Sequence, residues 1–360
     1  MEGLLGGYAA ELPTCRQHAT PTAPPRRALG HTWSQTSRDG RRRAPASRFD
    51  EVTRVTKPEL HDDPLWPRAG QWIAPVDREG PERVADLALL GVPTFRTSIT
   101  PTKAFVTPEA IREALLRYST YSWSHDVDVS TLTAIDLGDI ADPDGPQGPE
   151  SVEQAVGIAA HCCRFLVALG GDNSLTYSVM RGLLGDRLEN SGLITIDAHH
   201  DLRDGQSNGS PVRQLIEAGL PGENVVQIGI GDFANSAAYA RRSREMGITV
   251  VTREALRGAD FAEVAWRAAD IAGAGGRPVF VDIDVDVCDR AEVPACPSAV
   301  PGGISADELR QLAFAVARDP RVVGADLVEI DTTIDSPDCR TTRLAALLVL
   351  ELAAGVASRA

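Results

Sequence analysis

Long apolar runs, paired cysteines and an excess of positive charge are all missing from this chain of 360 residues. No stretch reaches the roughly 18 consecutive apolar residues that are needed to cross a bilayer, and the opening residues lack the apolar core of a signal peptide. The six cysteines show no CxxC spacing. These absences predict a protein that is not in the membrane and that keeps its thiols free in a reducing cytoplasm.

The charge balance excludes one large class of partner. The chain has 36 basic and 50 acidic residues, for a formal net charge of -14. Nucleic acids require many cationic contacts to phosphate, so a nucleic-acid partner is not expected. Hydrophobic residues make up 43% of the chain, enough for a large core. A small-molecule substrate is the better expectation.

The composition divides the chain into three parts. Residues 1–55 are rich in Pro, Arg, Ser and Thr and show no helical or strand period, which predicts a disordered or spurious extension. A basic docking arm is the alternative for this part. Residues 56–83 are expected to pack as an N-terminal segment on the main domain, which covers residues 84–360.

Strand-like and helix-like patterns alternate along the main domain. Short apolar runs such as VADLALLGV, RFLVALGG, GLITID and PVFVDID are separated by segments with helical spacing. One of these helices is predicted to begin in TPEAIREALL, with Thr107 as its N-cap and Pro108 in its first turn. This alternation predicts an α/β fold with three α/β/α layers and a mostly parallel central sheet.

Polar clusters follow three of the predicted strands. Asp197, His199 and Asp201 come from IDAHHD, Asp284 and Asp286 come from DIDVD, and GGDN supplies a third cluster. Alternate residues of an extended chain lie on one side, and ligands bind beyond the carboxyl ends of parallel strands. Grouped buried carboxylates repel unless a cation lies between them. Oxygen donors with an imidazole favour Mn²⁺, although Zn²⁺, Fe²⁺ and Ni²⁺ are alternatives, and two clusters suggest two ions.

These motifs resemble those of the ureohydrolase (arginase/agmatinase) family. GGDNS, DAHHD, DVDVCD, a later PGG and VEID follow one another as the family's signatures do. The resemblance implies an arginase-like fold, two Mn²⁺ ions per subunit and a homo-oligomer. It implies that Asp197 and Asp284 bridge the ions. The full implied ligand set is Asn173, Asp197, His199, Asp201, Asp284 and Asp286.

The third cluster departs from the family pattern. Many members carry His where this chain has Asn173, and an amide oxygen is a weaker ligand than imidazole. The first site, which Asn173 and Asp201 complete, is therefore expected to hold its ion loosely. Asp282 is expected to face away from the ligands, and Asp289 either to contact a ligand from behind or to structure the following loop. Asp172 is expected to orient a ligand or to anchor the loop, and the alternative is a cap of the next helix.

The loop after DAHHD resembles that of formimidoylglutamases. Arg203 and Arg213 are interpreted as partners for two substrate carboxylates, and Asn208 as a hydrogen-bonding residue. For Arg213 the alternative is a structural contact at the start of a helix. The expected reaction is hydrolysis of N-formimidoyl-L-glutamate to L-glutamate and formamide, in histidine degradation.

Two further residues are given catalytic roles. The resemblance implies that Glu329 binds the planar N–C–N cation of the substrate, and Asp201 is expected to relay a proton. His200 and the cysteines are interpreted as structural. Two alternatives remain: a urea-releasing agmatinase, guanidinobutyrase or guanidine hydrolase, and a catalytically silent homologue.

Overall fold

The computed structural model describes residues 61, 63–76 and 84–359. The predicted extension, residues 1–55, lies outside these residues. The described strands are β1 Ala74–Pro75, β2 Leu87–Val92, β3 Tyr121–Ser122, β4 Val127–Asp128, β5 Ala134–Asp139, β6 Leu166–Gly170, β7 Gly192–Ile196, β8 Val225–Ile230, β9 Thr249–Thr252, β10 Val279–Asp284 and β11 Val322–Val328. The described α-helices are α1 Ala69–Trp72, α2 Thr107–Leu115, α3 Gly148–Cys162, α4 Leu175–Leu184, α5 Pro211–Glu217, α6 Ala237–Glu245, α7 Phe261–Ala272, α8 Ala306–Ala317 and α9 Arg340–Ala357.

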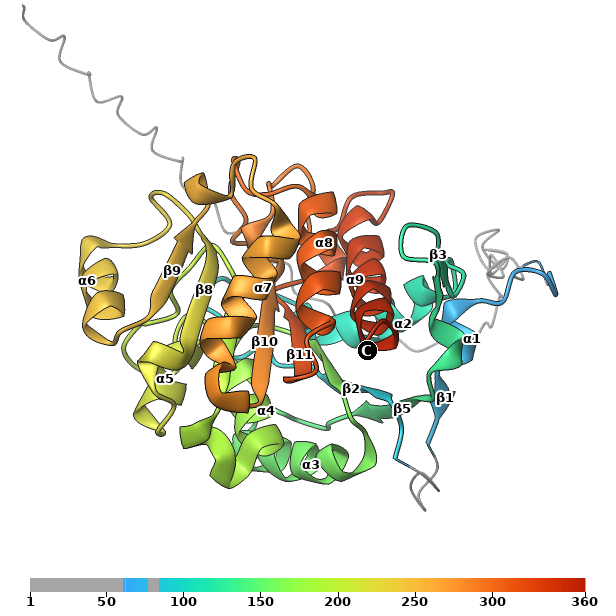
Figure 1. The fold of residues 1–360 in the computed structure, drawn as a ribbon, viewed down its shortest axis with the longest axis horizontal. Helices are drawn as coiled ribbons and strands as arrows, with labels where there is room; N and C mark the ends of the chain where they lie inside the picture. The colour runs from blue at the N-terminus through green and yellow to red at the C-terminus, as the bar shows by residue number, and fades with distance from the viewer. Residues whose placement is uncertain (1–60, 62, 77–83, 360) are drawn as a thin grey trace, which may run out of the picture. The chain divides into compact units, whose positions relative to one another are not determined.

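Nine of these strands form one central sheet. Its order is β1-β5-β2-β6-β11-β10-β7-β8-β9, and every neighbouring pair in it is parallel. Strands β3 and β4 form a separate antiparallel pair. The central strands β6, β7 and β10 are buried along their whole length, as expected for a parallel sheet covered on both faces. The predicted three-layer α/β fold is confirmed (Figure 1).

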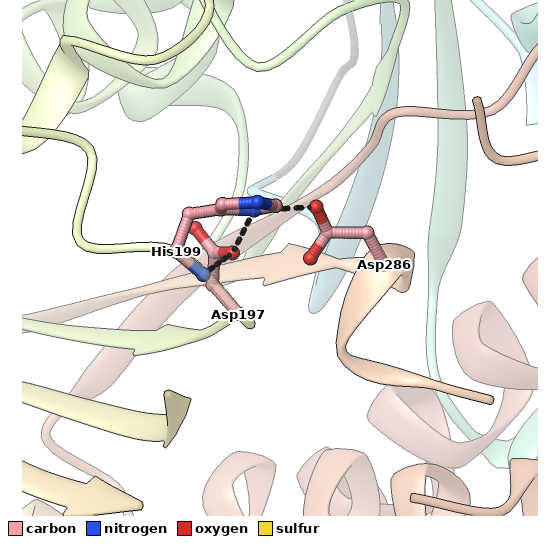
Figure 2. A group of neighbouring side chains, drawn as sticks. All are labelled: Asp197, His199 and Asp286. Carbon is pink, nitrogen blue, oxygen red and sulfur yellow. Dashed lines mark hydrogen bonds and ion pairs between the residues drawn. The ribbon is translucent and has the colours of Figure 1, made fainter. Parts of the chain in front are cut away.

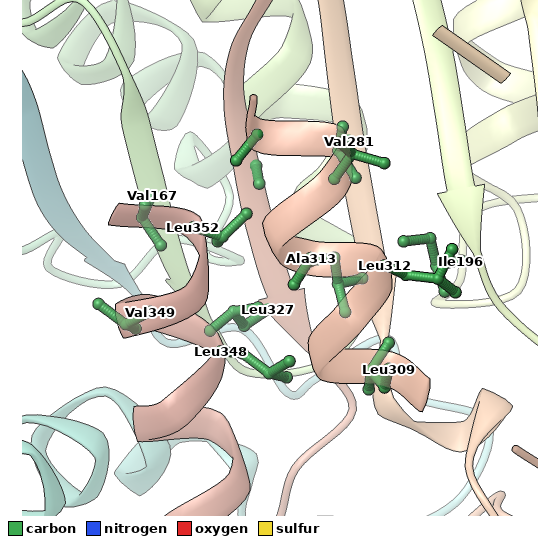
Figure 3. Packing of buried hydrophobic residues seen from close by; sticks show 14 of the residues in the cluster. Val167, Ile196, Val281, Leu309, Leu312, Ala313, Leu327, Leu348, Val349 and Leu352 are labelled. Carbon is green, nitrogen blue, oxygen red and sulfur yellow. The ribbon is translucent and has the colours of Figure 1, made fainter. Parts of the chain in front are cut away.

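Two apolar clusters lie on the two faces of this sheet. The first packs residues of α2, α7, α8 and α9 against one face, and Figure 3 shows Leu312 of α8 and Leu352 of α9 beside Val281 and Leu327 of the sheet. The second packs α3, α4 and α5 against the other face. Alternate residues of each central strand therefore belong to different layers.

The start of α2 differs from the prediction. The helix begins at Thr107 itself, and the side chain of its N-cap residue, Val106, makes no capping hydrogen bond. The hydroxyl of Thr107 donates instead to the carbonyl oxygen of Ile330, at 2.5 Å. A tertiary hydrogen bond to the segment after β11 replaces the expected local cap.

The three predicted polar clusters follow neighbouring strands. The motifs GGDN, DAHHD and DVDVCD begin at the carboxyl ends of β6, β7 and β10. Glu329 follows β11, which lies between β6 and β10. The fold therefore brings four loops that are distant in sequence to one edge of the sheet, at its centre. None of the helices described is both long and apolar enough to span a membrane.

Candidate metal centre

Asp197, His199 and Asp286 form one compact group at this edge (Figure 2). Nδ1 of His199 lies 2.7 Å from Oδ2 of Asp286 and 3.5 Å from Oδ1 of Asp197. The backbone holds the group in place, because the N–H of His199 donates to Asp197 and the N–H of Ala198 donates to Asp286. Potential ligand atoms of the three residues lie within 4.8 Å of one another, close enough to share an ion.

A second group shares Asp197 with the first. Oxygens of Asp197, Asp201 and Asp282 also lie within 4.8 Å of one another, and all three residues are buried. The expectation that Asp282 faces away from the ligands is therefore wrong. Its matching position in the strand alternation was the better guide to its direction.

Asn173 lies beside the second group without turning its oxygen to it. Its Nδ2 donates to Oδ2 of Asp201 at 2.5 Å, and its Oδ1 accepts from the hydroxyl of Thr176 at 2.7 Å. Asp201 has a positive φ of 51°, an unfavourable backbone conformation for a residue other than glycine. Such strain is often found at functional sites, where the surrounding structure maintains it.

Asp284, the other expected bridging ligand, ends β10 beside these groups. It is buried, and its Oδ1 accepts the N–H of Asp286 at 2.8 Å. Burial, followed by the charge of Asp286, raises the pKa of Asp284 well above its ordinary value. This bond links the Asp284 carboxylate directly to the backbone of the next expected ligand.

The electrostatics of the cluster favour a cation. Burial, and then the neighbouring charge of Asp286, raises the pKa of Asp197 to about 7. Burial raises the pKa of Asp201 as well, and repulsion by Asp197 adds to this effect. Burial would lower the pKa of His199, but Asp286 and Asp197 outweigh it and raise that pKa to about 12. Oδ2 of Asp197 has no hydrogen-bond partner among the described residues. A bound divalent ion would compensate this buried negative charge, and carboxylates with one imidazole suit Mn²⁺.

The loop after β6 is fixed by close backbone packing. A side chain at Gly171 would place its Cβ 1.8 Å from the carbonyl oxygen of Thr94, so only glycine fits. Asp172 accepts from both the N–H and the hydroxyl of Ser174, which favours the loop-anchoring alternative for this residue. Asp289 similarly accepts the N–H groups of Ala291 and Gly302, in agreement with a role in structuring its loop.

A cavity of about 280 Å³ opens over the acidic cluster. Glu329 forms part of its wall, and its Oε1 accepts from the Nδ2 of Asn208 at 2.9 Å and from the N–H of Asn173 at 2.8 Å. Burial, and then the charge of Asp172, raises the pKa of Glu329 to about 7. Glu329 also has a positive φ, of 64°. Its carboxylate is therefore held by two donors in the same cavity as the expected metal ligands.

The two predicted substrate arginines have different environments. Arg203 is exposed and lines the cavity over the acidic cluster. Arg213 lines an adjacent hollow, and its guanidinium donates to the carbonyl oxygens of Arg203 and Gly205 and pairs with Glu217. The structure thus brings Arg203 and Asn208 to the cavity, whereas Arg213 supports the loop from outside.

The loop after β8 supplies lining residues that sequence reasoning missed. Asn235, Ser236 and Tyr239 line the cavity, as does Ser298 from the loop after β10. Asn235 is fixed by accepting the N–H of His200 and donating to the carbonyl of Ala198. The segment GDFANSAAY, which contributes three of these residues, was a signal, but its polar residues have no spacing that marks them as a site.

His200 and the buried cysteines near the site have structural environments. His200 is buried, and its Nδ1 lies 2.7 Å from Oε1 of Gln227. Burial raises the pKa of the Cys288 thiol and that of the Cys296 thiol, so neither is activated as a nucleophile. The described cysteines are free thiols.

Known proteins resemble this chain in both sequence and fold. The family model described as "Arginase family" matches residues 85–355. A formimidoylglutamase from Halalkalibacterium halodurans is 33% identical over 301 residues, which are 80% of this chain and 92% of the relative. The crystal structure of formimidoylglutamase from Bacillus subtilis has a TM-score of 0.78 and 29% identity, covering 84% of this chain and 96% of that one. A Trypanosoma cruzi formiminoglutamase solved with Mn²⁺ has a TM-score of 0.70 and 26% identity, covering 78% of this chain and 97% of that one.

Proposed function

Because this chain belongs to the arginase family, we propose that it hydrolyses N-formimidoyl-L-glutamate to L-glutamate and formamide in histidine degradation. The enzyme is a hydrolase of a linear amidine C–N bond. The observation that carries the proposal is the cavity that has Asp201, Asp284 and Glu329 in its wall and Arg203 at its rim. One such cavity can hold a cationic amidinium at its acidic end and a carboxylate near the arginine.

The metal is manganese, with two ions per subunit. His199 and Asp286 would hold one ion, Asp201 would hold the other, and Asp197 and Asp284 would bridge them. The bound pair supplies a water whose pKa is lowered from about 15.7 towards about 7. The first site, beside Asn173, is the weaker one, because no imidazole contributes to it.

Glu329 and Asp201 are the side chains that bind the substrate cation and transfer a proton. Glu329 accepts hydrogen bonds from the two nitrogens of the amidinium, and Asn208 keeps its carboxylate turned towards the cavity by donating to it. Water adds to the amidine carbon, and the C–N bond to glutamate breaks as the departing nitrogen gains a proton. Asp201 transfers that proton from the water to the nitrogen.

Substrate selection depends on Arg203. Formimidoylglutamate has two carboxylates, and the exposed guanidinium of Arg203 can form a charge-assisted bond to one of them. Asn235 and Ser236 offer polar contacts to the other. Arg213 acts indirectly, by holding the backbone carbonyl of Arg203.

The cell compartment and the assembly are part of the same proposal. The free cysteines suit a cytoplasmic protein, and a homo-oligomer is proposed by analogy with the family. The partner in the reaction is the small-molecule substrate alone.

Product analysis tests the function. Protein reconstituted with Mn²⁺ is incubated separately with formimidoylglutamate, agmatine, arginine and guanidinobutyrate, and formamide and urea are assayed. We expect formamide from the first substrate and no urea from the others. Urea from agmatine or arginine would identify a guanidine hydrolase, and no product from any substrate would identify a silent homologue.

A further inference from the structure

A row of buried polar side chains crosses the sheet one layer below the metal ligands. Asp326 of β11, Asp282 of β10, Thr195 of β7 and Gln227 of β8 are consecutive register partners. Each of the four is fully buried. The row lies on the face that α4 covers, where Asp282 precedes Asp284 by two residues. Burying so many polar groups is costly unless each one is satisfied.

Most of this row is hydrogen-bonded. Gln227 contacts His200 through both of its amide atoms, at 2.7 Å and 3.1 Å. Oδ2 of Asp326 lies 2.8 Å from the hydroxyl of Thr176, whose single proton it shares with Asn173, and Oδ1 of Asp326 has no partner among the described residues. Asp282 differs, because neither of its carboxylate oxygens has a hydrogen-bond donor among the described residues. The neighbouring carboxyl of Asp326 can share a hydrogen bond with it only if one of the two is protonated.

The carboxylate of Asp282 reaches the candidate metal centre. One of its oxygens lies within 4.8 Å of oxygens of both Asp197 and Asp201. Oxygen ligands stand about 2.0 to 2.6 Å from hard divalent cations, so two ligands of one ion can be up to roughly 5 Å apart. The three carboxylates can therefore hold one ion between them, and that ion would supply the partner that Asp282 lacks.

The side-chain amide of Asn173 is poorly oriented to bind the same ion. Its oxygen accepts from Thr176, and its nitrogen donates to Asp201. Turning the amide over would place its oxygen 2.5 Å from the acceptor oxygen of Asp201, which is a repulsive contact. In the present orientation the amide nitrogen donates to Asp201, and the amide oxygen shares the single proton of the Thr176 hydroxyl with Asp326.

We propose that Asp282 is the ligand of the first metal ion in place of the imidazole that this chain lacks at position 173, and that it joins Asp197, Asp201 and the shared ligand Asp284. This inference rests on the proposed metal-dependent function. Asp197 then belongs to both sites, as the overlap of the two groups indicates. An all-oxygen first site favours Mn²⁺ or Mg²⁺, whereas an imidazole would shift preference towards Zn²⁺ or Ni²⁺.

Metal stoichiometry of the full chain tests this proposal. Asp282→Asn keeps the shape of the side chain and can still donate a hydrogen bond to Asp326, so the local packing is retained. We expect wild type to bind two Mn²⁺ per subunit and Asp282→Asn to bind one at the same free Mn²⁺ concentration. Removing a direct ligand should weaken the first site by more than the roughly 10- to 100-fold typical of second-layer changes. The readouts are isothermal titration calorimetry and elemental analysis.

Asp326→Asn is the matched control, because it changes the other carboxylate of the buried pair. We expect this variant to keep two Mn²⁺. Two Mn²⁺ of unchanged affinity in Asp282→Asn would overturn the proposal, and would mean that Asp282 only shares a proton with Asp326. The same titrations of Asp282→Ser provide a second test if Asp282→Asn does not fold, judged by circular dichroism.

A rescue experiment identifies which ion is lost. Histidine at position 173 would add an imidazole on the side of Asp201, so Asn173→His combined with Asp282→Asn should recover the second equivalent of metal. Failure of rescue, together with loss of the ion held by His199, would assign Asp282 to the other site and overturn the proposal. Formamide production by wild type is scored separately. The ligand proposal can therefore fail while the proposed function stands, and the function can fail while the stoichiometry supports the ligand.

Discussion

Strands β7 and β10 differ between their two faces at their carboxyl ends, although the first residues of both strands pack into apolar clusters on both faces. On β10, Val281 and Ile283 belong to the apolar cluster under α8 and α9, while Asp282 and Asp284 alternate with them and share the side of Phe280, which packs in the other cluster. The end of β7 shows the same alternation: Ile196 belongs to the apolar cluster under α8 and α9, whereas Thr195 and Asp197 lie on the other side. At these strand ends one face is apolar and the other carries the candidate metal ligands. The apolar face allows the polar one to hold buried charges at fixed positions.

Replacing Asp284 by Ala should give the largest effect on the polar face. Its carboxylate is buried and is proposed to serve both ions, so bound Mn²⁺ and formamide production should be lost together. We expect activity to fall by more than about 100-fold, the upper end for changes outside the ligands themselves. Retention of two equivalents of Mn²⁺ would remove Asp284 from the bridging position.

Ile283→Val is the matched control on the apolar face of the same strand. Ile283 is fully buried next to Asp284 in sequence, but its side chain lies in the other layer. Removing one methylene should cost about 0.5 to 1.5 kcal/mol of unfolding free energy and leave metal stoichiometry unchanged. Loss of metal in this control would show that the two faces are not separable.

Arg203→Ala tests the rim of the cavity, where a smaller effect is expected. A charge-assisted hydrogen bond contributes roughly 1.5 to 3 kcal/mol, so KM for formimidoylglutamate should rise between about 10- and 150-fold. Metal content should not change, because Arg203 is exposed and has no role in the ligand groups. Unchanged kinetics would weaken the assignment of a dicarboxylate substrate.

The mostly parallel sheet and the location of the site could be predicted because both follow from local pattern. Apolar runs that end in acidic motifs mark parallel strands whose carboxyl ends meet. The side to which the Asp282 side chain points could also be predicted, since Asp282 and Asp284 are two residues apart on one strand. The family resemblance led to the wrong expectation. Parity along a strand is set by backbone geometry and does not depend on which residues relatives carry.

Contacts between distant segments could not be predicted in the same way. Arg203 and Arg213 lie in one loop and are chemically alike, yet only Arg203 lines the cavity, because the carbonyl oxygens around Arg213 are set by the folded loop. Asn235 comes from a separate loop whose polar residues have no spacing that marks a site. Thr107 had a sequence pattern typical of a cap, but Ile330 is its partner across the fold. These outcomes depend on tertiary packing, which local sequence does not encode.

The smallest expected effect is on the pH dependence of stability, which tests the buried carboxylates of the polar face. In chelated protein the pKa of Asp197 and that of Glu329 are raised to about 7, chiefly by burial, from ordinary values near 4. Between about pH 4 and pH 7 the folded state then binds more protons than the unfolded state, so stability falls as pH rises through this window. The raised pKa of His199 acts in the same direction at higher pH. Melting temperature measured with EDTA should therefore be higher at pH 5 than at pH 7.5.

Saturating Mn²⁺ should remove most of this fall, because the ions favour the ionised carboxylates in the folded state and restore their ordinary low pKa. The chelated and Mn²⁺-loaded profiles should diverge with rising pH, and Glu329→Gln should flatten the chelated profile by removing one buried titrating group. The slope lost can be at most about 1.4 kcal/mol per pH unit for one proton. Parallel profiles with and without Mn²⁺ would mean that the buried carboxylates do not sense the metal. The buried carboxylates would then have only a structural role, and the cavity above them would not be a metal centre.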